Sequence, residues 1–146
     1  LRLGEADKAW LAASLAASKR EQQGQQGQQG QQEPTVPPIE ICPTSNMRTL
    51  ALSALVDHPT LGTWLKVGFP FTICTDDSGV FATSLSQEFD LVAKAFGLTA
   101  EEVLRLSRGA ADHIFERDPH VVAQVRRRFD DFGARAGLLS TGKARL

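Results

Sequence analysis

The sequence predicts an α/β fold, and two observations support that prediction. Two short β-rich runs, residues 39–42 and 71–74, each lead into polar residues, and segments with helical periodicity lie before, between and after them. Strands that alternate with helices are expected to lie parallel and to be joined by right-handed crossovers. Because each strand of a parallel sheet needs neighbours and cover on both faces, two strands predict a slice of a larger α/β domain.

Length, charge and hydropathy exclude several classes of protein. The chain has 146 residues, the size of one domain, and its 16 basic and 17 acidic side chains give a net charge of −1. This balance leaves no excess of positive charge that would attract a nucleic acid or an anionic membrane, so we expect neither as a partner. No apolar run approaches the ~20 residues that span a bilayer, and no secretory signal is recognisable. The chain begins with Leu1 rather than Met, which we interpret as the sign of a fragment or a processed product.

The two cysteines favour a reducing compartment. Cys42 and Cys74 are too few for a disulfide scaffold, and each ends an apolar run. Free cysteine is among the most buried residue types. We therefore predict two buried thiols and a cytoplasmic protein.

The first 38 residues are expected to hold a helix and an insertion. Residues 1–20 are predicted to form a helix before the first strand, because Trp10, Leu11 and Leu15 make an apolar stripe at helical spacing. A Gln-Gln-Gly repeat and a proline-rich linker follow in residues 21–38. The repeat contains no apolar residue, so we predict a disordered surface insertion.

Residues 39–137 carry the predicted sheet and its helices. A strand over Ile39–Cys42 is expected to lead into a polar loop at Thr44–Asn46. A helix is predicted to begin at Pro59, a favoured first helical position, and to end at Gly68. The second strand is predicted over Phe71–Cys74.

Three helices are predicted after the second strand, each with a start signal. Ser84 with Gln87, and Thr99 with Glu102, match the capping box, and Asp118 precedes a proline at the first helical position. The apolar stripes expected to face the core are, in chain order, Leu85, Phe89, Val92 and Phe96; Val103, Leu106, Ala110 and Ile114; and Val122, Val125, Phe129 and Phe132. Residues 138–146 are expected to form a frayed tail.

An acidic pair, Asp76 and Asp77, follows the second strand. The reacting groups of α/β barrels lie at the carboxyl ends of the strands. Two adjacent carboxylates at that depth are costly unless a metal ion, a cation or hydrogen-bond donors compensate them, so one could bind a metal while the other contacts a substrate. On these residues alone, a solvated turn in which an aspartate caps the Ser78-Gly79 corner is the favoured interpretation.

Two motifs resemble those of the adenosine/AMP deaminase family. Residues 39–46, IEICPTSN, resemble the E-x-C-P-x-S-N segment on the seventh strand of adenosine deaminase-type barrels. Residues 57–59, DHP, with Gly68 and residues 73–77, ICTDD, resemble the H-P…G…T-D-D segment that leads into the eighth strand. The order and spacing agree, and the resemblance covers about residues 39–118. It implies the C-terminal portion of a metal-dependent (β/α)8 TIM barrel, made of its last two strands and its C-terminal helices.

The residues after the acidic pair favour one branch of that family. Adenosine deaminases proper usually have T-D-D-P, whereas Ser78-Gly79 follows the pair here, and residues 80–89 look like the adenosine deaminase-like branch, whose members act as N6-methyl-AMP deaminases. The resemblance implies a full-length, monomeric enzyme that uses Zn²⁺ to deaminate a 6-aminopurine nucleotide or nucleoside hydrolytically. Conversion of N6-methyl-AMP to IMP and methylamine is favoured, and adenosine as the substrate is the alternative.

The resemblance also implies roles for individual residues. Asp76 matches the family's aspartate zinc ligand, and Asp77 matches the aspartate that hydrogen-bonds the purine ring. Zinc would lower the pKa of a bound water so that hydroxide can attack C6 of the purine. Ser45 and Asn46 match motif positions near the pocket, where they either touch the substrate or brace the loop, and we favour bracing.

Most of the family's catalytic residues have no counterpart in this sequence. The His-x-His, His-x-Gly-Glu and Gly-His-Gly segments supply three zinc-binding histidines, a proton-shuttling glutamate and a catalytic histidine, and none of them is present. The histidines here are His58, predicted to cap a helix, and His113 and His120, predicted to lie on the surface or to pack. Catalytic zinc normally has at least three protein ligands. We therefore assign no catalytic residue within this chain and expect the isolated chain to be inactive and to bind zinc poorly.

Two readings without catalysis stay open. The chain could be a degenerate interaction module with a Gln-rich arm, although the intact Thr75–Asp77 segment speaks against it. It could also be a helical module without enzymatic ancestry, although such a bundle needs no strands that end in polar residues.

Overall fold

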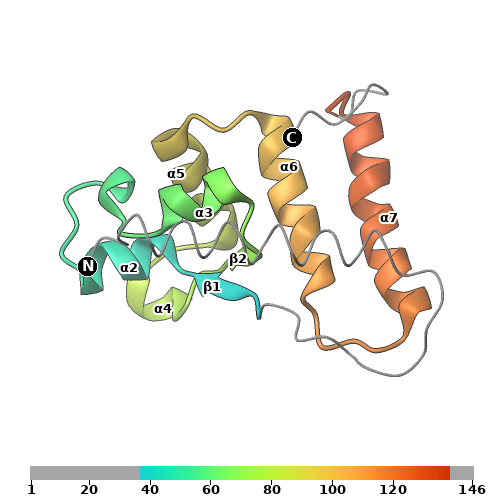
Figure 1. Ribbon diagram of the computed structural model, residues 1–146, viewed down its shortest axis with the longest axis horizontal. Coiled ribbons are helices and arrows are strands. Elements are labelled where there is room, and N and C mark those ends of the chain that lie inside the picture. The colour runs from blue at the N-terminus through green and yellow to red at the C-terminus, as the bar shows by residue number, and fades with distance from the viewer. Residues whose placement is uncertain (1–36, 139–146) are drawn as a thin grey trace.

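The structure is a computed structural model, and it describes residues 37–138 (Figure 1). The helix predicted in residues 1–20, nearly all of the predicted insertion at residues 21–38, and the tail beyond Leu138 lie outside the described residues. The described part mixes helices and strands, as the sequence predicts.

Two short parallel strands form the sheet of the described residues. Strand β1 (Ile39–Ile41) pairs with β2 (Phe71–Ile73), so that Ile41 lies opposite Ile73. Both predicted strands are confirmed, each one residue shorter than expected. The amide of Cys74 donates to the carbonyl of Ile41 at 2.8 Å, which holds the two chain segments together just beyond the strands.

The segment after β1 corrects the first of our predictions. Thr44–Asn46, expected to be a loop, lies within helix α2 (Pro43–Thr49). Pro43 can begin the helix because the amide hydrogen that proline lacks has no partner at the first helical position. The amide of Asn46 donates to the carbonyl of Cys42 at 2.7 Å, which closes the first turn.

Helix α3 lies in the crossover between the two strands. It spans Leu61–Val67 and so begins two residues after the predicted Pro59, with Thr60 at its N-cap. A short 3₁₀ turn, η1 (Leu55–Asp57), precedes it and was not predicted. Gly68 ends α3 in the left-handed conformation (φ 65°), as predicted, and glycine adopts that conformation at little steric cost.

Five helical elements follow β2 in the part of the chain that the structure describes. They are α4 (Ser78–Phe81), α5 (Leu85–Phe96), α6 (Ala100–Gly109), the 3₁₀ turn η2 (Ala110–Asp112) and α7 (Pro119–Arg135). The three long helices were predicted, whereas α4 and η2 were not. Thr99 and Glu102 form the full capping box of α6, and Asp118 caps α7. Ser84 caps α5, because its hydroxyl oxygen accepts a hydrogen bond from the amide of Gln87. The Gln87 side chain accepts a hydrogen bond from the Ser84 hydroxyl and not from the Ser84 amide, so only half of that capping box forms.

Each predicted apolar stripe is at least partly buried except for one exposed residue at one of its ends. Val92 on α5 is fully buried, but Leu85 and Phe132 are about half exposed. Ile114 is 40 % exposed because α6 ends at Gly109, which takes the chain off the helical register that the stripe assumed. Leu104, outside the predicted stripe, is the buried residue of α6.

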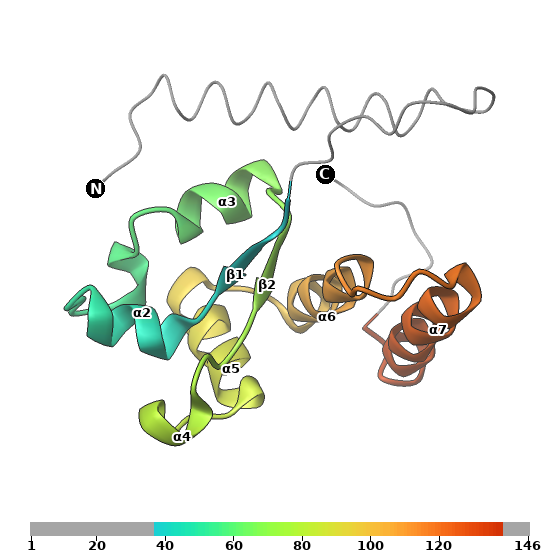
Figure 2. The same cartoon turned by 90° about the horizontal axis from the view of Figure 1, so that it is seen from below.

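The hydrophobic core lies between the strands and the helices around them. Its buried side chains come from β1, β2, η1, α3 and α5. They are Ile41, Leu55, Leu61, Phe71, Ile73 and Val92. Figures 1 and 2 both show α2 and α4 at the carboxyl ends of the strands, and both show α6 and α7 side by side, with α6 nearer the strands.

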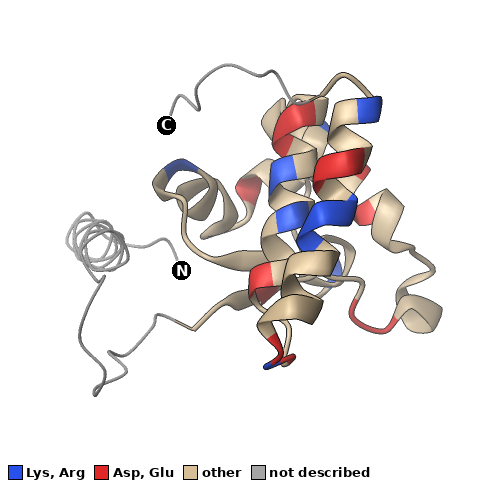
Figure 3. Cartoon of the chain, turned by 90° about the vertical axis from the view of Figure 1, so that its right-hand side faces the viewer, with Lys and Arg blue, Asp and Glu red and all other residues tan. Residues whose placement is uncertain are grey.

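Charges of both signs are mixed on α6 and α7 (Figure 3). Arg108 on α6 binds Asp130 on α7 through two hydrogen bonds, of 2.6 and 3.2 Å. Arg126 on α7 binds Asp112 in η2 at 2.6 Å. These pairs link α7 to α6 and to η2. Within residues 37–138, none of the helices combines the length and the apolar character that crossing a bilayer requires.

Candidate active-site edge

The two chain segments that leave the sheet meet at its carboxyl edge. β1 runs into α2 through Cys42, and β2 runs through Cys74 and Thr75 into the acidic pair. Because the strands are parallel and in register, these segments begin side by side. The topology therefore brings both family-like motifs to one edge, as the sequence predicts.

Ser45 and Asp76 link the two motifs directly. The Ser45 hydroxyl donates a hydrogen bond of 2.8 Å to Oδ2 of Asp76. Ser45 is 4 % exposed, and its place on the inner side of α2 aims its hydroxyl at the end of β2. Asp76 has a left-handed backbone (φ 56°), which is uncommon outside glycine, asparagine and aspartate. The contact and the backbone conformation together fix the direction of the Asp76 carboxylate.

Asp77 has a local structural role. It is the N-cap of α4, and its Oδ1 accepts a hydrogen bond of 3.3 Å from the amide of Val80. Both aspartates are exposed, so our expectation that the pair lies at a depth where charge is costly is wrong for the described residues. The capped corner that the acidic pair alone predicts is present, and it uses one oxygen of Asp77.

His58 braces the same edge from the crossover. Its Nδ1 accepts hydrogen bonds from the amides of Thr60 (3.3 Å) and Leu61 (3.1 Å), which confirms the predicted helix cap. Since Nδ1 is an acceptor, the neutral ring carries its proton on Nε2, which lies 3.3 Å from Oδ1 of Asn46 and donates to it. Burial lowers the pKa of His58 and so favours this neutral form. The contacts of Asn46 and Ser45 agree with the predicted bracing role.

The two cysteines are free thiols beside the acidic pair. Each is half-buried rather than fully buried as predicted. Burial is the main cause that raises the pKa of Cys42 to about 11, with a further contribution from the negative charge of Glu40. Burial likewise raises the pKa of Cys74. Both groups are therefore protonated, poorly nucleophilic thiols at neutral pH.

Sequence reasoning missed Glu88. This residue on α5 is fully buried, and its carboxylate accepts hydrogen bonds from the amide of Thr44 at 2.8 Å and from the hydroxyl of Thr83 at 2.5 Å. A signal was available, because Glu88 stands three residues after Leu85 and four before Val92, on the face predicted to be apolar. A carboxylate at such a position needs buried hydrogen-bond donors.

A complete metal site is not formed by the described residues. Within residues 37–138 no group of three or more His, Cys, Asp or Glu side chains lies close enough together to hold a metal ion. His113 is half-buried after η2, and His120 is exposed in the first turn of α7, which agrees with the predicted surface or packing roles. Asp76 therefore has too few such neighbours among the described residues to form a metal site with them.

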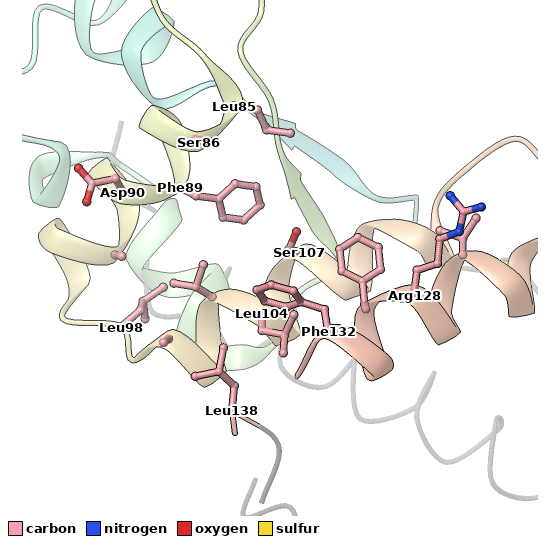
Figure 4. Close-up of a pocket in the computed structure, with 15 residues that line it drawn as sticks. Leu85, Ser86, Phe89, Asp90, Leu98, Leu104, Ser107, Arg128, Phe132 and Leu138 are labelled. Atoms are coloured by element: carbon pink, nitrogen blue, oxygen red, sulfur yellow. The ribbon is translucent and has the colours of Figure 1, made fainter. Parts of the chain in front are cut away.

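A hollow elsewhere on the chain is apolar. It has a volume of about 880 Å³ and lies between α5, α6 and α7 (Figure 4). Leu85 and Phe132, the two stripe residues that remain half exposed, line it together with Phe89. Neither aspartate of the acidic pair lines this hollow, so it is separate from the carboxyl edge.

Comparison with known proteins decides the family. The family model for adenosine deaminase matches residues 33–125, which is more than half of the chain. The chain belongs to the adenosine deaminase family. The matched range contains both motifs, the acidic pair and Glu88.

Relatives within the adenosine deaminase family agree with the predicted branch. N6-methyl-AMP deaminase of Bos taurus is 47 % identical over 81 residues, which cover 56 % of this chain and 23 % of the relative. N6-mAMP deaminase of Arabidopsis thaliana is 41 % identical over 93 residues, 64 % of this chain and 26 % of the relative. The resemblance to the adenosine deaminase-like branch is thus confirmed. The chain spans about a quarter of the length of these relatives.

Solved structures of the same branch share the fold of the described part. An Arabidopsis ADAL complexed with IMP aligns with a TM-score of 0.62 and 38 % identity, over 67 % of this chain and 28 % of that one. The same protein complexed with GMP aligns with a TM-score of 0.60 and 39 % identity, over 65 % and 28 % of the two chains. Both ligands in these relatives are purine nucleotides.

Proposed function

We propose that this chain is the C-terminal part of a zinc-dependent purine deaminase. In this proposal residues 39–137 are the end of a (β/α)8 barrel, with β1 and β2 as its last two strands. The observation that carries the proposal is the Ser45–Asp76 contact at the shared carboxyl edge, beside Asp77, inside the segment that matches the family. The carboxyl ends of barrel strands are where such enzymes hold their reacting groups.

Asp76 is the proposed zinc ligand of this segment. The donor chemistry fits, because zinc binds carboxylate oxygen, and the carboxylate is exposed and held in one direction by Ser45. One carboxylate is too few for a catalytic zinc site, so the site is completed by residues outside the described part. When bound, zinc lowers the pKa of a coordinated water and so provides a nucleophile near neutral pH.

Asp77 is the proposed contact to the purine ring. Its Oδ1 caps α4, which leaves Oδ2 without a hydrogen-bond partner among the described residues. That oxygen can share a hydrogen bond with a ring nitrogen of the purine, with the proton between the two atoms, and so orient the base. Held by the cap, the carboxylate is positioned before the base arrives, which lowers the entropic cost of orienting the base.

The proposed substrate is N6-methyl-AMP, and the products are IMP and methylamine. Support comes from the relatives, several of which are named N6-methyl-AMP deaminases, and from the related structures that hold IMP or GMP. Adenosine is the competing substrate within the family. The reaction is hydrolytic: water adds at C6 of the purine, the C6–N bond breaks, and the amine leaves with a proton.

The test uses the complete protein that contains this chain, loaded with zinc. We expect it to release methylamine and IMP from N6-methyl-AMP and to turn over adenosine much more slowly. Asp76→Ala should abolish both zinc retention and turnover, whereas Asp77→Ala should retain zinc and lose turnover. Asp90→Asn, which removes an exposed carboxylate on α5, is the matched control and should change neither. Equal turnover of adenosine would contradict the nucleotide substrate, and a wild-type protein without zinc would contradict the proposal itself.

A further inference from the structure

Glu88 is a buried acid that the proposed chemistry does not use. It is 0 % exposed, and among the described residues no Lys, Arg or His lies within ion-pair distance of it. A carboxylate without water is costly unless its oxygens are satisfied. Here each oxygen accepts one hydrogen bond, from the Thr44 amide and from the Thr83 hydroxyl.

The first of these bonds caps α2 from a distance. Cys42 stands at the N-cap of α2 but offers no side-chain hydrogen bond, and the first turn contains no acidic residue. The amides of a first turn have no partner inside the helix. Glu88, 44 residues later in the sequence, supplies the missing acceptor to Thr44 and places a negative charge at the positive end of the helix.

The second bond holds the segment on the other side of the acidic pair. Thr83 lies between α4 and α5, directly after Ala82, whose left-handed backbone (φ 51°) ends α4. Its hydroxyl donates to Oε1 of Glu88. One side chain of α5 therefore ties down both α2, which follows β1, and the end of α4, which follows the acidic pair.

The capped turn of α2 also carries the contact to Asp76. Thr44, the residue that Glu88 holds, immediately precedes Ser45, whose hydroxyl donates to Asp76. A shift of the first turn of α2 would move the Ser45 hydroxyl away from the carboxylate. The connection thus runs from Glu88 through Thr44 and Ser45 to Asp76.

We propose that Glu88 is a positioning residue, which sets the direction of the Asp76 carboxylate by holding the first turn of α2. This inference rests on the proposed function, in which Asp76 binds zinc. Residues that orient metal ligands through hydrogen bonds change metal affinity by about 10–100-fold when they are removed. If Glu88 has this role, removing it should weaken zinc binding only while Ser45 is present.

The test is a double-mutant cycle in the complete protein, with zinc affinity measured by competition against a chelator. Glu88→Ala and Ser45→Ala should each weaken zinc binding about 10–100-fold. The double variant should be no weaker than the poorer single variant, because both changes interrupt the same connection. Glu88→Gln should stay close to wild type, since its amide oxygen accepts from Thr44 and its amide group donates to the Thr83 hydroxyl.

A variant at a second core residue shows whether a loss of zinc affinity comes from the positioning role of Glu88 or from a general loss of stability. Val92 lies one turn after Glu88 on α5 and is also fully buried. Val92→Ala should lower the Tm while leaving zinc affinity unchanged. If Glu88→Ala prevents folding, Glu88→Asp replaces it in the cycle, since a side chain shorter by one methylene cannot reach both donors.

Three outcomes would overturn the inference. The first is wild-type zinc affinity in Glu88→Ala, or in Glu88→Asp where that variant replaces it. The second is a loss of zinc affinity in that variant that adds to the loss in Ser45→Ala. The third is an equal loss of zinc affinity in a Val92→Ala protein with the same Tm. If the wild-type protein binds no zinc, the proposed function fails first. If the wild type binds zinc and the cycle fails, only the role of Glu88 is wrong.

Discussion

The Ser45 hydroxyl donates a hydrogen bond of 2.8 Å to Oδ2 of Asp76, across 31 residues of sequence. This contact joins the first turn of α2 to the end of β2. It leaves Oδ1 of Asp76 with no hydrogen-bond donor among the described residues. A carboxylate held through one oxygen and exposed at the other is well arranged to give a single ligand oxygen to a metal ion.

Replacing Ser45 by alanine should weaken zinc binding by the complete protein. We expect a loss of about 10–100-fold, because the carboxylate then has to be oriented at the moment of binding. Thr49→Ala is the control, since the Thr49 hydroxyl donates to the Ser45 carbonyl at 2.9 Å and does not touch Asp76. Chelator competition on both variants measures the difference, and equal affinities would show that the hydroxyl has no part in zinc binding.

The sequence predicts correctly those features that depend on contacts between residues close together in the chain. Both strands, the caps of α6 and α7 and the end of α3 at Gly68 follow from residues close together in the chain, and these predictions are confirmed. The acidic pair was found because its neighbours form a recognisable motif. Its exposure and the capping role of Asp77 match the solvated, capped turn that the acidic pair alone predicts.

The features that sequence reasoning missed depend on distant residues. Helix α2 has no local cap, and its acceptor is Glu88, 44 residues away. Local signals therefore predicted a loop there. Leu85 and Phe132 follow helical periodicity, but they line an open hollow instead of a closed core. Periodicity shows that a helix has an apolar face and does not show what covers that face.

His58 should make stability depend on pH in the weakly acidic range. The fold needs the neutral ring because Nδ1 accepts two amide hydrogen bonds, and burial lowers its pKa below the usual 6.5. The unfolded chain then binds the proton more readily, so stability is complete above pH 6.5 and falls as the pH drops toward the folded-state pKa. Denaturant unfolding of the complete protein at pH 7.5 and pH 5 should show this loss.

The variant His58→Asn tests whether His58, and not another acid or base, causes this dependence of stability on pH. The Asn side chain offers an oxygen to the same amides but does not titrate, and a helix cap is worth about 1 kcal/mol. We expect the variant to be close to wild type at pH 7.5 and to lose less stability at pH 5. An identical pH dependence in both proteins would rule out His58 as the responsible group.

Cys42 should resist alkylation while the protein is folded. Its pKa of about 11, raised mainly by burial, leaves very little thiolate at pH 7.5, and the pKa of Cys74 is raised as well. Iodoacetamide should therefore label both thiols slowly in the native protein and quickly in guanidinium chloride, as mass spectrometry can record. Rapid labelling of native Cys42 would contradict this burial.

The ion pair between Arg108 and Asp130 should contribute only modestly to the docking of α7. Its geometry is favourable, and the hydrogen bonds to Asp130 raise the pKa of Arg108 while lowering that of Asp130. Both side chains are more than a third exposed, however, so water and salt screen the charges. We expect Asp130→Asn to cost about 1 kcal/mol or less in the free energy of unfolding. A much larger loss that persists in 1 M salt would indicate a role beyond this pair.

The isolated 146-residue chain should not deaminate purines. Its sequence offers only three histidines, and His58 uses Nδ1 for a helix cap and Nε2 for Asn46. No cluster of three ligands forms within residues 37–138, and one carboxylate does not hold catalytic zinc. Purified chain supplied with excess zinc and N6-methyl-AMP should release no methylamine above the level of an Asp76→Ala control. Release above that level would mean that this chain completes a catalytic site by itself, and the assignment of the remaining ligands to residues outside the described part would then be wrong.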